Sequence, residues 1–458
     1  MNKKKRLTKL KTKYDAIVIG GGPAGIIGAV TARKYYPDKK IFLIKSVGAG
    51  VIPCGIPYMF TTLGKPEDNA VGNAPLEKNN IDVKVDEVIE INPEEKKIKT
   101  RDNKEYGYEK IILATGSSPI NPRIPGNNKK GIYLINKEMN HLKNLKKDIC
   151  NAKDIVIVGG GFIGVEFADE LSKIKGANVS IVEMMPHIMS ASFDEEFRKL
   201  AKEKLVEKGV NIITGKSVEE FNGKERVESV LLSDNSCLPA QVVIMGIGAG
   251  PNSFLAAKAG LEIGKSRGII VDEYMRTSVA DIFAIGDCAE KKDFFTRKKI
   301  NVMLASTATA EARIAGANLF KINVVKENKG TIAMYSTQIG DLTLASAGLT
   351  EKSALEEGFE IAVGRAECVD KHPGPMPGAN KIKIKLIFSK QSGLLLGGQV
   401  AGGCSAGEII NIIGLAMQKA TTLTEIETLQ VATHPKLTAA PTIYPLINAA
   451  QNALKDCK

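Results

Sequence analysis

The chain of 458 residues contains no tryptophan, four histidines and few aromatic residues of any kind (5%). Its seven cysteines are scattered and form no C-x-x-C pair, which argues against a zinc or iron–sulfur site and against a secreted disulfide framework. No apolar run reaches the roughly 18 residues that a membrane-spanning helix needs, and we expect no signal peptide. These absences predict a cytoplasmic protein with no metal site and no membrane contact.

The chain has more positive than negative residues, but this excess gives little support for nucleic-acid binding. Lysine supplies most of the formal net charge of +12, and no basic stripe interleaved with aromatic residues is present. A solvated lysine-rich surface is the simplest interpretation, and steering of an anionic substrate is the alternative. The length predicts about three domains with ample core.

A glycine-rich turn follows the first apolar run of the chain. Residues 14–19 are predicted to form a buried strand, and a helix is predicted up to about Tyr36. Between them, Gly20, Gly22 and Gly25 form a G-x-G-x-x-G turn. Such glycines permit a tight turn, let a pyrophosphate approach the backbone and allow the helix to pack close to the strand. This unit predicts one dinucleotide site.

The same arrangement occurs a second time. Residues 155–158 are predicted to form a strand, and Gly159, Gly161 and Gly164 lie in the turn before a helix through Leu171. The next predicted strand, 179–182, ends in Glu183. A carboxylate there accepts hydrogen bonds from both ribose hydroxyls and repels a 2′-phosphate, so NADH is favoured over NADPH. Two such units predict two dinucleotide sites.

Two linking segments, 111–119 and 242–248, are predicted to leave the first unit and to return to it. After the return, residues 277–287 place Asp287 at the end of a strand, and a helix is predicted from Ala305 to about Phe320. We expect an α/β fold with two Rossmann-like domains, one inserted in the other, and a C-terminal α+β domain for association. The predicted limits are 1–118 with 246–324, then 119–245, and finally 325–458.

In that C-terminal part, strands are predicted at 333–335, 381–388 and 394–400, and a helix at 405–419. No further glycine fingerprint occurs there.

A lone cysteine lies between two prolines shortly after the first unit. Cys54 stands in Ile52-Pro53-Cys54-Gly55-Ile56-Pro57-Tyr58, and the next cysteine along the chain is Cys150. A single redox thiol has no internal partner, so it must cycle through a mixed disulfide, a persulfide or a sulfenic acid. A buried structural cysteine is the alternative interpretation.

Taken together, these motifs resemble the pyridine nucleotide–disulfide oxidoreductases along nearly the whole chain. The resemblance is carried by the paired glycine turns, by Ala114-Thr115-Gly116, by Gly286-Asp287 and by the segment around Cys54. It is closest to the single-cysteine branch, which includes coenzyme A-disulfide reductases, persulfide or polysulfide reductases and NADH oxidases. A segment from Gly340 to Thr350 is similar to the family's dimerisation domain and implies a homodimer.

The resemblance also implies roles for particular residues. Gly20, Gly22 and Gly25 would hold the FAD pyrophosphate, Asp287 would bond the ribityl chain, and the helix from Ala305 would face the flavin. NADH would lie on Gly159, Gly161, Gly164 and Glu183. Phe162 would cover the flavin until nicotinamide displaces it, with Glu166 near the nicotinamide. Cys54 would lie on the opposite flavin face, near a helix N-terminus that favours its thiolate.

Several positions depart from the family pattern. Lys45 replaces the acid that usually holds the FAD ribose, and we still expect FAD to be retained. Gly250 stands where arginine is frequent, and Met303 stands where proline usually precedes the flavin-facing helix. His434 resembles a histidine that larger disulfide reductases supply from the partner subunit, but the acid usual five residues later is Ala439.

The leading hypothesis is an FAD-dependent, NADH-driven reductase of a small disulfide, persulfide or polysulfide, with a coenzyme A derivative as one candidate. The alternative is an NADH oxidase or peroxidase in which oxygen or peroxide is the acceptor and Cys54 cycles through sulfenic acid. A third hypothesis is a non-catalytic NADH sensor. No metal, nucleic acid or membrane is expected to take part.

Overall fold

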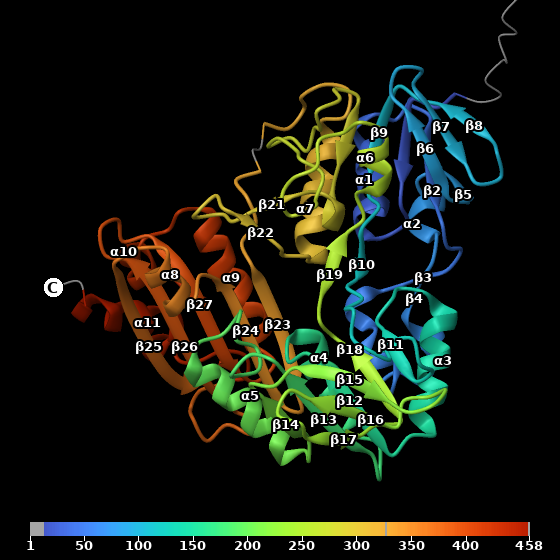
Figure 1. Ribbon diagram of the computed structural model, residues 1–458. Coiled ribbons are helices and arrows are strands. Elements are labelled where there is room, and N and C mark those ends of the chain that lie inside the picture. The colour runs from blue at the N-terminus through green and yellow to red at the C-terminus, as the bar shows by residue number, and fades with distance from the viewer. Residues whose placement is uncertain (1–12, 326–327, 457–458) are drawn as a thin grey trace, which may run out of the picture.

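The computed structural model describes residues 13–325 and 328–456. Figure 1 shows three parts. Each of them is built around one five-stranded sheet. The pieces of the predicted domains at 1–12, 326–327 and 457–458 lie outside the described residues. In the described part, no helix has the length and apolar character to cross a membrane.

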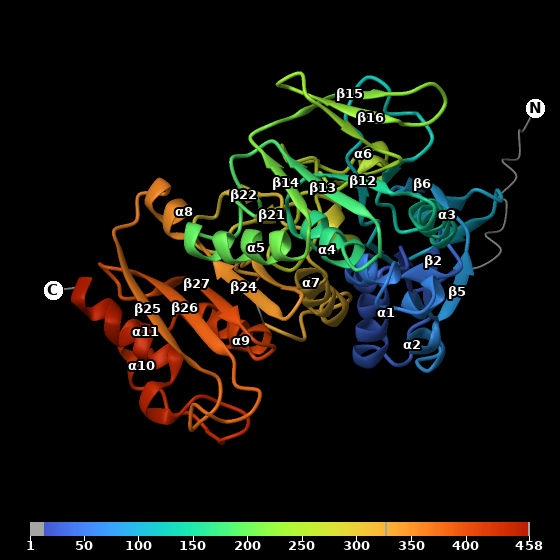
Figure 2. The same cartoon turned by 90° about the horizontal axis from the view of Figure 1, so that it is seen from below.

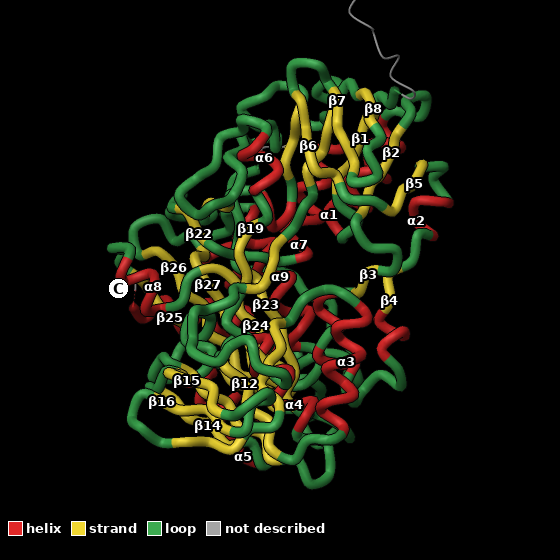
Figure 3. Tube along the Cα trace, turned by 45° about the vertical axis from the view of Figure 1, so that its right-hand side comes forward, coloured by secondary structure: helices red, strands yellow, loops and turns green. Residues whose placement is uncertain are grey.

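The first sheet is parallel and has the strand order β20-β9-β1-β2-β5. Its central strands are fully buried, as expected for parallel strands covered on both faces. Helices α1 and α7 lie side by side next to this sheet (Figure 3). The bounds are β1 Ala16–Ile19, α1 Pro23–Tyr35, β2 Ile41–Lys45, β5 Asp82–Val85, β9 Lys110–Leu113, β20 Ile282–Ala284 and α7 Ala305–Ala317.

The second sheet is also parallel, with the order β11-β18-β12-β13-β14. It lies below the first part in Figure 1, and a small antiparallel sheet, β15-β16-β17, adjoins it. The strands are β11 Ile132–Leu134, β12 Asp154–Val158, β13 Asn178–Glu183, β14 Asn211–Thr214, β15 Val218–Asn222, β16 Ser229–Leu232, β17 Cys237–Pro239 and β18 Val242–Met245. The helices are α3 Met139–Cys150, α4 Phe162–Leu171 and α5 Glu195–Glu207.

Two short antiparallel strands join these parts. β10 (Ser117–Pro119) carries the chain out of the first part and β19 (Ala249–Pro251) brings it back, with Ser117 opposite Pro251. Because β9 and β20 are neighbours in the first sheet, the second part is inserted between them. The predicted α/β class with one Rossmann-like unit inside the other is confirmed. The limits near residues 118 and 245 stay a prediction.

The C-terminal sheet is antiparallel, with the order β23-β24-β27-β26-β25. One hydrophobic cluster packs α9 and α11 against this sheet, and Figure 2 shows the sheet beside α5 of the second part. The predicted α+β domain is confirmed, although two strands and several helices were not foreseen. The elements are β23 Met334–Ile339, β24 Leu342–Gly348, α8 Glu351–Glu356, β25 Ile361–Val369, β26 Lys381–Ser389, β27 Leu395–Gly402, α9 Ala406–Gln418, α10 Leu423–Glu427 and α11 Pro445–Ala453.

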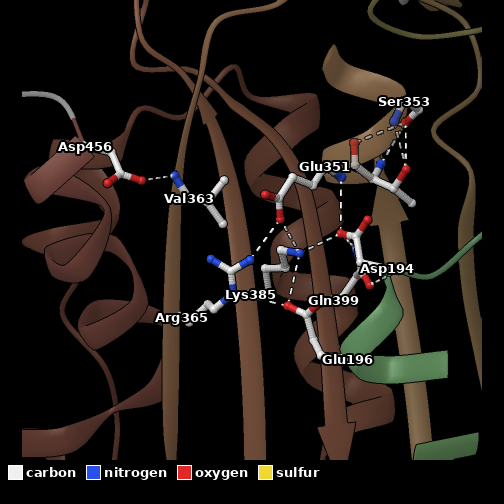
Figure 4. Close-up of polar contacts among 10 residues, drawn as sticks. Asp194, Glu196, Glu351, Ser353, Val363, Arg365, Lys385, Gln399 and Asp456 are labelled. Atoms are coloured by element: carbon white, nitrogen blue, oxygen red, sulfur yellow. Dashed lines mark hydrogen bonds and ion pairs between the residues drawn. The ribbon is translucent and has the colours of Figure 1, made fainter. Parts of the chain in front are cut away.

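A buried ion cluster joins the second and third parts (Figure 4). The side chain of Lys385 is 1% exposed, and its Nζ lies 2.9 Å from Asp194, 3.0 Å from Glu196 and 2.5 Å from Glu351. Arg365 pairs with Glu196 at 3.1 Å and with Glu351 at 2.9 Å. Asp194 and Glu196 belong to the start of α5, whereas the other three residues come from the C-terminal part. The cluster therefore fixes the second sheet relative to the third.

Candidate active site

The loop that carries Cys54 is held in place by one buried asparagine. Strands β3 (Gly50–Val51) and β4 (Ala70–Val71) pair at its base. Asn69, 3% exposed, bonds Ile52 twice, through its side-chain amide and its backbone carbonyl, each at 3.0 Å. A Cβ atom at Gly55 would lie 2.0 Å from the Asn69 side-chain oxygen, so any other residue there would displace Asn69 from its bond to Ile52. The sequence pattern did not single out Asn69, because it lies outside the Pro-Cys-Gly motif.

The thiol of Cys54 reaches solvent, yet the surrounding protein raises its pKa. Burial of the sulfur has the largest effect, the charge of Glu166 adds to it, and Lys137 opposes it. Cys54 lies in a single 3₁₀ turn, η1 (Pro53–Gly55), followed by a second turn, η2 (Pro57–Met59). The expected helix N-terminus that would lower the thiol pKa is therefore reduced to one short turn. The six described cysteines, Cys54 among them, are free thiols.

Helix α4 brings Phe162 and Glu166 to the same region. Burial raises the pKa of the Glu166 carboxyl to about 7, while a 2.9 Å hydrogen bond from Thr337 Oγ1 acts in the opposite direction. Glu166 in turn raises the pKa of Cys54 and of Tyr58, which places the three groups in one electrostatic neighbourhood. The Phe162 ring stacks on Tyr335 of β23, with centroids 4.6 Å apart and planes 21° apart.

A second carboxylate on α4 joins this helix to the chain just after Cys54. Glu170 is 1% exposed and accepts hydrogen bonds from Thr62 N at 3.0 Å and from Thr62 Oγ1 at 2.8 Å. Thr61 Oγ1 and the Lys173 ammonium also bond this carboxylate. Burial alone would raise the pKa of Glu170, but these bonds lower it below its ordinary value. The helix with Phe162 and Glu166 is thereby fixed relative to the cysteine loop.

The first glycine turn fits a pyrophosphate. A Cβ atom at Gly20, where φ is +122°, would lie 2.0 Å from the Ala114 carbonyl, and one at Gly25 would lie 2.0 Å from the Gly20 carbonyl. These two glycines are required by packing within the protein. A Cβ atom at Gly22, the residue before α1, would meet nothing within 4 Å. The space at Gly22 lies over the start of α1, where a phosphate would be bound by helix N–H groups.

The second glycine turn repeats this geometry. Cβ atoms at Gly159 and Gly164 would lie 2.6 and 1.9 Å from backbone oxygens, whereas one at Gly161 would meet nothing within 4 Å. Glu183 ends β13, and its carboxylate accepts hydrogen bonds from Gly160 N at 2.6 Å and from Met185 N at 2.7 Å. Each carboxylate oxygen keeps further acceptor capacity for a ribose hydroxyl.

Asp287 lies in a 3₁₀ turn (η4, Gly286–Cys288) beside α7. Its carboxylate accepts a 2.7 Å hydrogen bond from Ser117 Oγ and lies 3.5 Å from the ammonium of Lys137. Gly286, at φ +71°, donates its N–H to the buried carboxylate of Glu311 at 2.8 Å. Lys137 was not singled out from the sequence, because it lies in a loop of the inserted part.

The Ala114-Thr115-Gly116 segment is anchored from the returning strand. Thr115 Oγ1 donates to the Asn252 carbonyl at 2.6 Å, and the Asn252 amide donates to the Thr115 carbonyl at 3.0 Å. Gly116 adopts a φ of +69°. Ala305 is the first residue of α7 and follows Met303 and the capping Leu304. The segment, Asp287 and the start of α7 thus surround the place predicted for a flavin.

Lys45 lies where an acid was expected, and its ammonium is bonded to residues outside the first glycine turn. Its Nζ donates to the Gly48 carbonyl at 2.6 Å and to Asn73 Oδ1 at 2.7 Å, and burial lowers its pKa. Its stem packs against Gly21, where a Cβ atom would lie 2.6 Å from Lys45 Cδ. Gly250 lies in β19, and a Cβ atom there would meet nothing within 4 Å.

Among the described residues, His434 makes hydrogen bonds only within its own turn, to Lys436, Leu437 and Thr438. Its side chain is exposed, and Nδ1 accepts a 3.2 Å hydrogen bond from Lys436 N. Among the described residues, no hydrogen bond or ion pair joins His434 to Cys54 or Glu166. Ala439 is buried, so no acid orients the histidine from that position. A role for His434 stays a prediction that requires a second subunit.

Comparison with known proteins decides the family. Residues 14–312 match the pyridine nucleotide-disulphide oxidoreductase family, and residues 334–443 match its dimerisation domain. The chain belongs to this family. The predicted resemblance is confirmed, and the chain is an oxidoreductase that uses FAD and NADH.

Two curated relatives and one solved structure are similar to most of the chain. The chain is 33% identical over 452 residues to an NADH oxidase of Methanocaldococcus jannaschii, covering 96% of this chain and 98% of that one. It is 30% identical over 399 residues to an NAD(P)H coenzyme A polysulfide/persulfide reductase of Pyrococcus horikoshii, covering 85% and 88%. The structure of an NAD-dependent persulfide reductase from A. fulgidus superposes with a TM-score of 0.89 at 30% identity, covering 96% and 83%.

Proposed function

We propose that this oxidoreductase uses NADH to reduce a small disulfide, persulfide or polysulfide through Cys54. The observation that supports the proposal most directly is the shared environment of Cys54, Tyr58 and Glu166, in which a lone accessible thiol faces the helix of the second glycine turn. A persulfide or polysulfide reductase is also among the relatives that cover most of the chain.

The residues present fit both cofactors. FAD would lie along Gly22, Ala114 to Gly116, Asp287 and the start of α7, and when bound it supplies a two-electron link between NADH and the cysteine. NADH would lie along Gly161 and Glu183, with its nicotinamide near Glu166. Phe162 would move out of the nicotinamide position, while Tyr335, which stacks on Phe162, would keep its place. The Glu183 carboxylate would repel a 2′-phosphate, which favours NADH over NADPH.

Cys54 would act as the nucleophile of the sulfur half-reaction. Its thiolate attacks one sulfur of the acceptor, the acceptor S–S bond breaks, and a mixed disulfide or persulfide forms on Cys54 as the first thiolate leaves. The electron pair from NADH then cleaves this new S–S bond, the second thiol or hydrogen sulfide leaves, and Cys54 returns to its reduced form. Lys137 is the nearby cation that favours the thiolate, because it lowers the pKa that burial and Glu166 raise.

The protein would act as a homodimer through its C-terminal domain. His434 would then reach the sulfur site of the partner subunit and protonate the departing thiolate. A coenzyme A derivative is the acceptor that we favour, since the relative from Pyrococcus horikoshii is named for coenzyme A polysulfide and persulfide.

The second candidate function is an NADH oxidase or peroxidase with Cys54 cycling through sulfenic acid. It is favoured by one specific observation, the 33% identity to an NADH oxidase over 96% of the chain. The two functions use the same residues and differ only in the acceptor.

The test is NADH oxidation under strict anaerobiosis, with coenzyme A disulfide, coenzyme A persulfide and polysulfide offered in turn. Wild type and Cys54→Ser are measured side by side, with Cys404→Ser, an exposed cysteine of the C-terminal part, as the matched control. We expect fast anaerobic turnover that disappears only in Cys54→Ser. Turnover in air alone would make oxygen the acceptor, and sulfur turnover retained by Cys54→Ser would refute the role of Cys54.

A further inference from the structure

One strand of the C-terminal domain contacts the helix that carries Phe162 and Glu166. Strand β23 packs against helix α4 of the inserted part. It delivers two side chains there: Tyr335 stacks on Phe162, and Thr337 donates a 2.9 Å hydrogen bond to Glu166 Oε1. Thr337 is 5% exposed, so water does not compete freely for this bond.

We propose that Thr337 is a positioning residue for Glu166, holding its carboxylate in one orientation and stabilising its charged form at the nicotinamide. The proposal rests on the proposed function, because it assumes that Glu166 faces the nicotinamide. It extends that function by making the C-terminal domain a part of the hydride-transfer site.

Hydride transfer from NADH would be assisted by the negative charge of Glu166. When hydride leaves the dihydronicotinamide ring with its electron pair, the ring becomes a cation, NAD⁺. An ionised carboxylate fixed beside the ring stabilises this developing positive charge, provided that it is already oriented. A buried carboxylate favours its neutral form, and a hydroxyl donated to the ionised form opposes that tendency.

The titratable groups around Glu166 come from several elements. Cys54 of η1 and Tyr58 of η2 face it, and Asp169 and Glu170 lie on its own helix. Lys137 and Asp287 act on the same thiol from the flavin side. On β23, Tyr335 has its pKa raised by burial. Since the charge of Glu166 raises the pKa of Cys54, loss of the Thr337 hydroxyl would change the cysteine as well as hydride transfer.

The experiment compares Thr337→Val, which removes the hydroxyl at nearly constant volume, with Thr337→Ser, which keeps it. Thr343→Val is the matched control. Thr343 is also buried, on the adjacent strand β24, and its register partner in the sheet is Gln338. The hydroxyl that bonds Glu166 belongs to Thr337. Glu166→Gln shows what complete loss of the carboxylate does. All variants are prepared as the FAD-loaded full chain.

The first readout is the rate of flavin reduction by NADH, measured anaerobically by stopped flow across pH. In wild type the rate should rise with pH through the ionisation of Glu166, at a pKa of about 7. Thr337→Val should move this midpoint upward by about one pH unit, the size expected for loss of a hydrogen bond to a charged group. Thr337→Ser and Thr343→Val should keep the wild-type midpoint.

The second readout is the pH dependence of Cys54 alkylation by iodoacetamide, which needs no NADH. Because Thr337→Val leaves Glu166 neutral more often near neutral pH, the thiol should be alkylated several-fold faster there, as it should be in Glu166→Gln. Unchanged midpoints in Thr337→Val, together with a clear effect of Glu166→Gln, would overturn the proposal and leave the proposed function intact. Failure of wild-type flavin to accept electrons from NADH would instead refute the proposed function.

Discussion

Glu170 of helix α4 accepts hydrogen bonds from both the N–H and the Oγ1 of Thr62, at 3.0 and 2.8 Å, and so connects the inserted part to the cysteine loop. The two residues are 108 positions apart in sequence. Through this contact, the helix with Phe162 and Glu166 keeps a fixed position relative to Cys54. In the proposed function, this contact would hold the nicotinamide side of the site at a fixed position relative to the thiol.

Replacement of this carboxylate should destabilise the contact in a pH-dependent way. The pKa of Glu170 is lowered in the folded protein, so its stabilising effect is present above its unfolded pKa of about 4.3 and is lost as pH falls through the folded value. Glu170→Gln should therefore unfold about 1–3 kcal/mol more easily at pH 7. Denaturant unfolding should show this difference shrinking below pH 4; a difference independent of pH would contradict the assignment.

The buried ammonium of Lys385 should be essential to the contact between the inserted part and the C-terminal domain. Lys385→Met leaves Asp194, Glu196 and Glu351 without their shared cation and should cost about 3–5 kcal/mol. Lys383→Met is the matched control on the same strand. Within residues 13–325 and 328–456, its 33% exposed side chain pairs only with Glu367, at 3.4 Å, so its loss should cost at most about 1 kcal/mol. Denaturant unfolding at fixed protein concentration compares the two; equal losses would show that the cluster contributes no more than a surface pair.

Glu183 should determine the choice of nicotinamide cofactor. Glu183→Arg replaces a carboxylate that would repel a 2′-phosphate with a guanidinium that would bind it. The kcat/KM ratio of NADPH to NADH should rise at least about tenfold, a change of about 1.4 kcal/mol in relative transition-state binding. Glu225→Arg, on an 85% exposed side chain of the same part, should leave the ratio unchanged. An unchanged ratio in Glu183→Arg itself would remove Glu183 from the ribose site.

His434 should affect the release of thiol but not the reduction of flavin. His434→Ala should slow turnover with a sulfur acceptor about 10²-fold, the lower end of general acid catalysis, while stopped-flow flavin reduction by NADH stays at the wild-type rate. His187→Ala, an exposed histidine of the inserted part, serves as the control. Wild-type turnover in His434→Ala would make His434 an ordinary surface residue.

The sequence by itself determined the two glycine turns and the order of the parts. A side chain at Gly25 or Gly164 would meet the carbonyl of the first glycine in its own turn, and one at Gly20 or Gly159 would meet the backbone of a neighbouring strand end. The close spacing of these glycines is visible in the linear sequence. The strands before both turns are continuous apolar runs, so their burial was also predictable.

Only the tertiary structure decided what surrounds Cys54 and Glu166. Asn69, Lys137 and Thr337 reach the site from three separate segments, and no spacing rule connects residues brought together by the docking of domains. The same reason explains why the prediction for the pKa of Cys54 was wrong. A lowered thiol pKa was expected from a local helix, whereas burial and the charge of a distant carboxylate raise it. The amino-acid order determines which residues each segment carries. Packing between segments determines the pKa values of those residues.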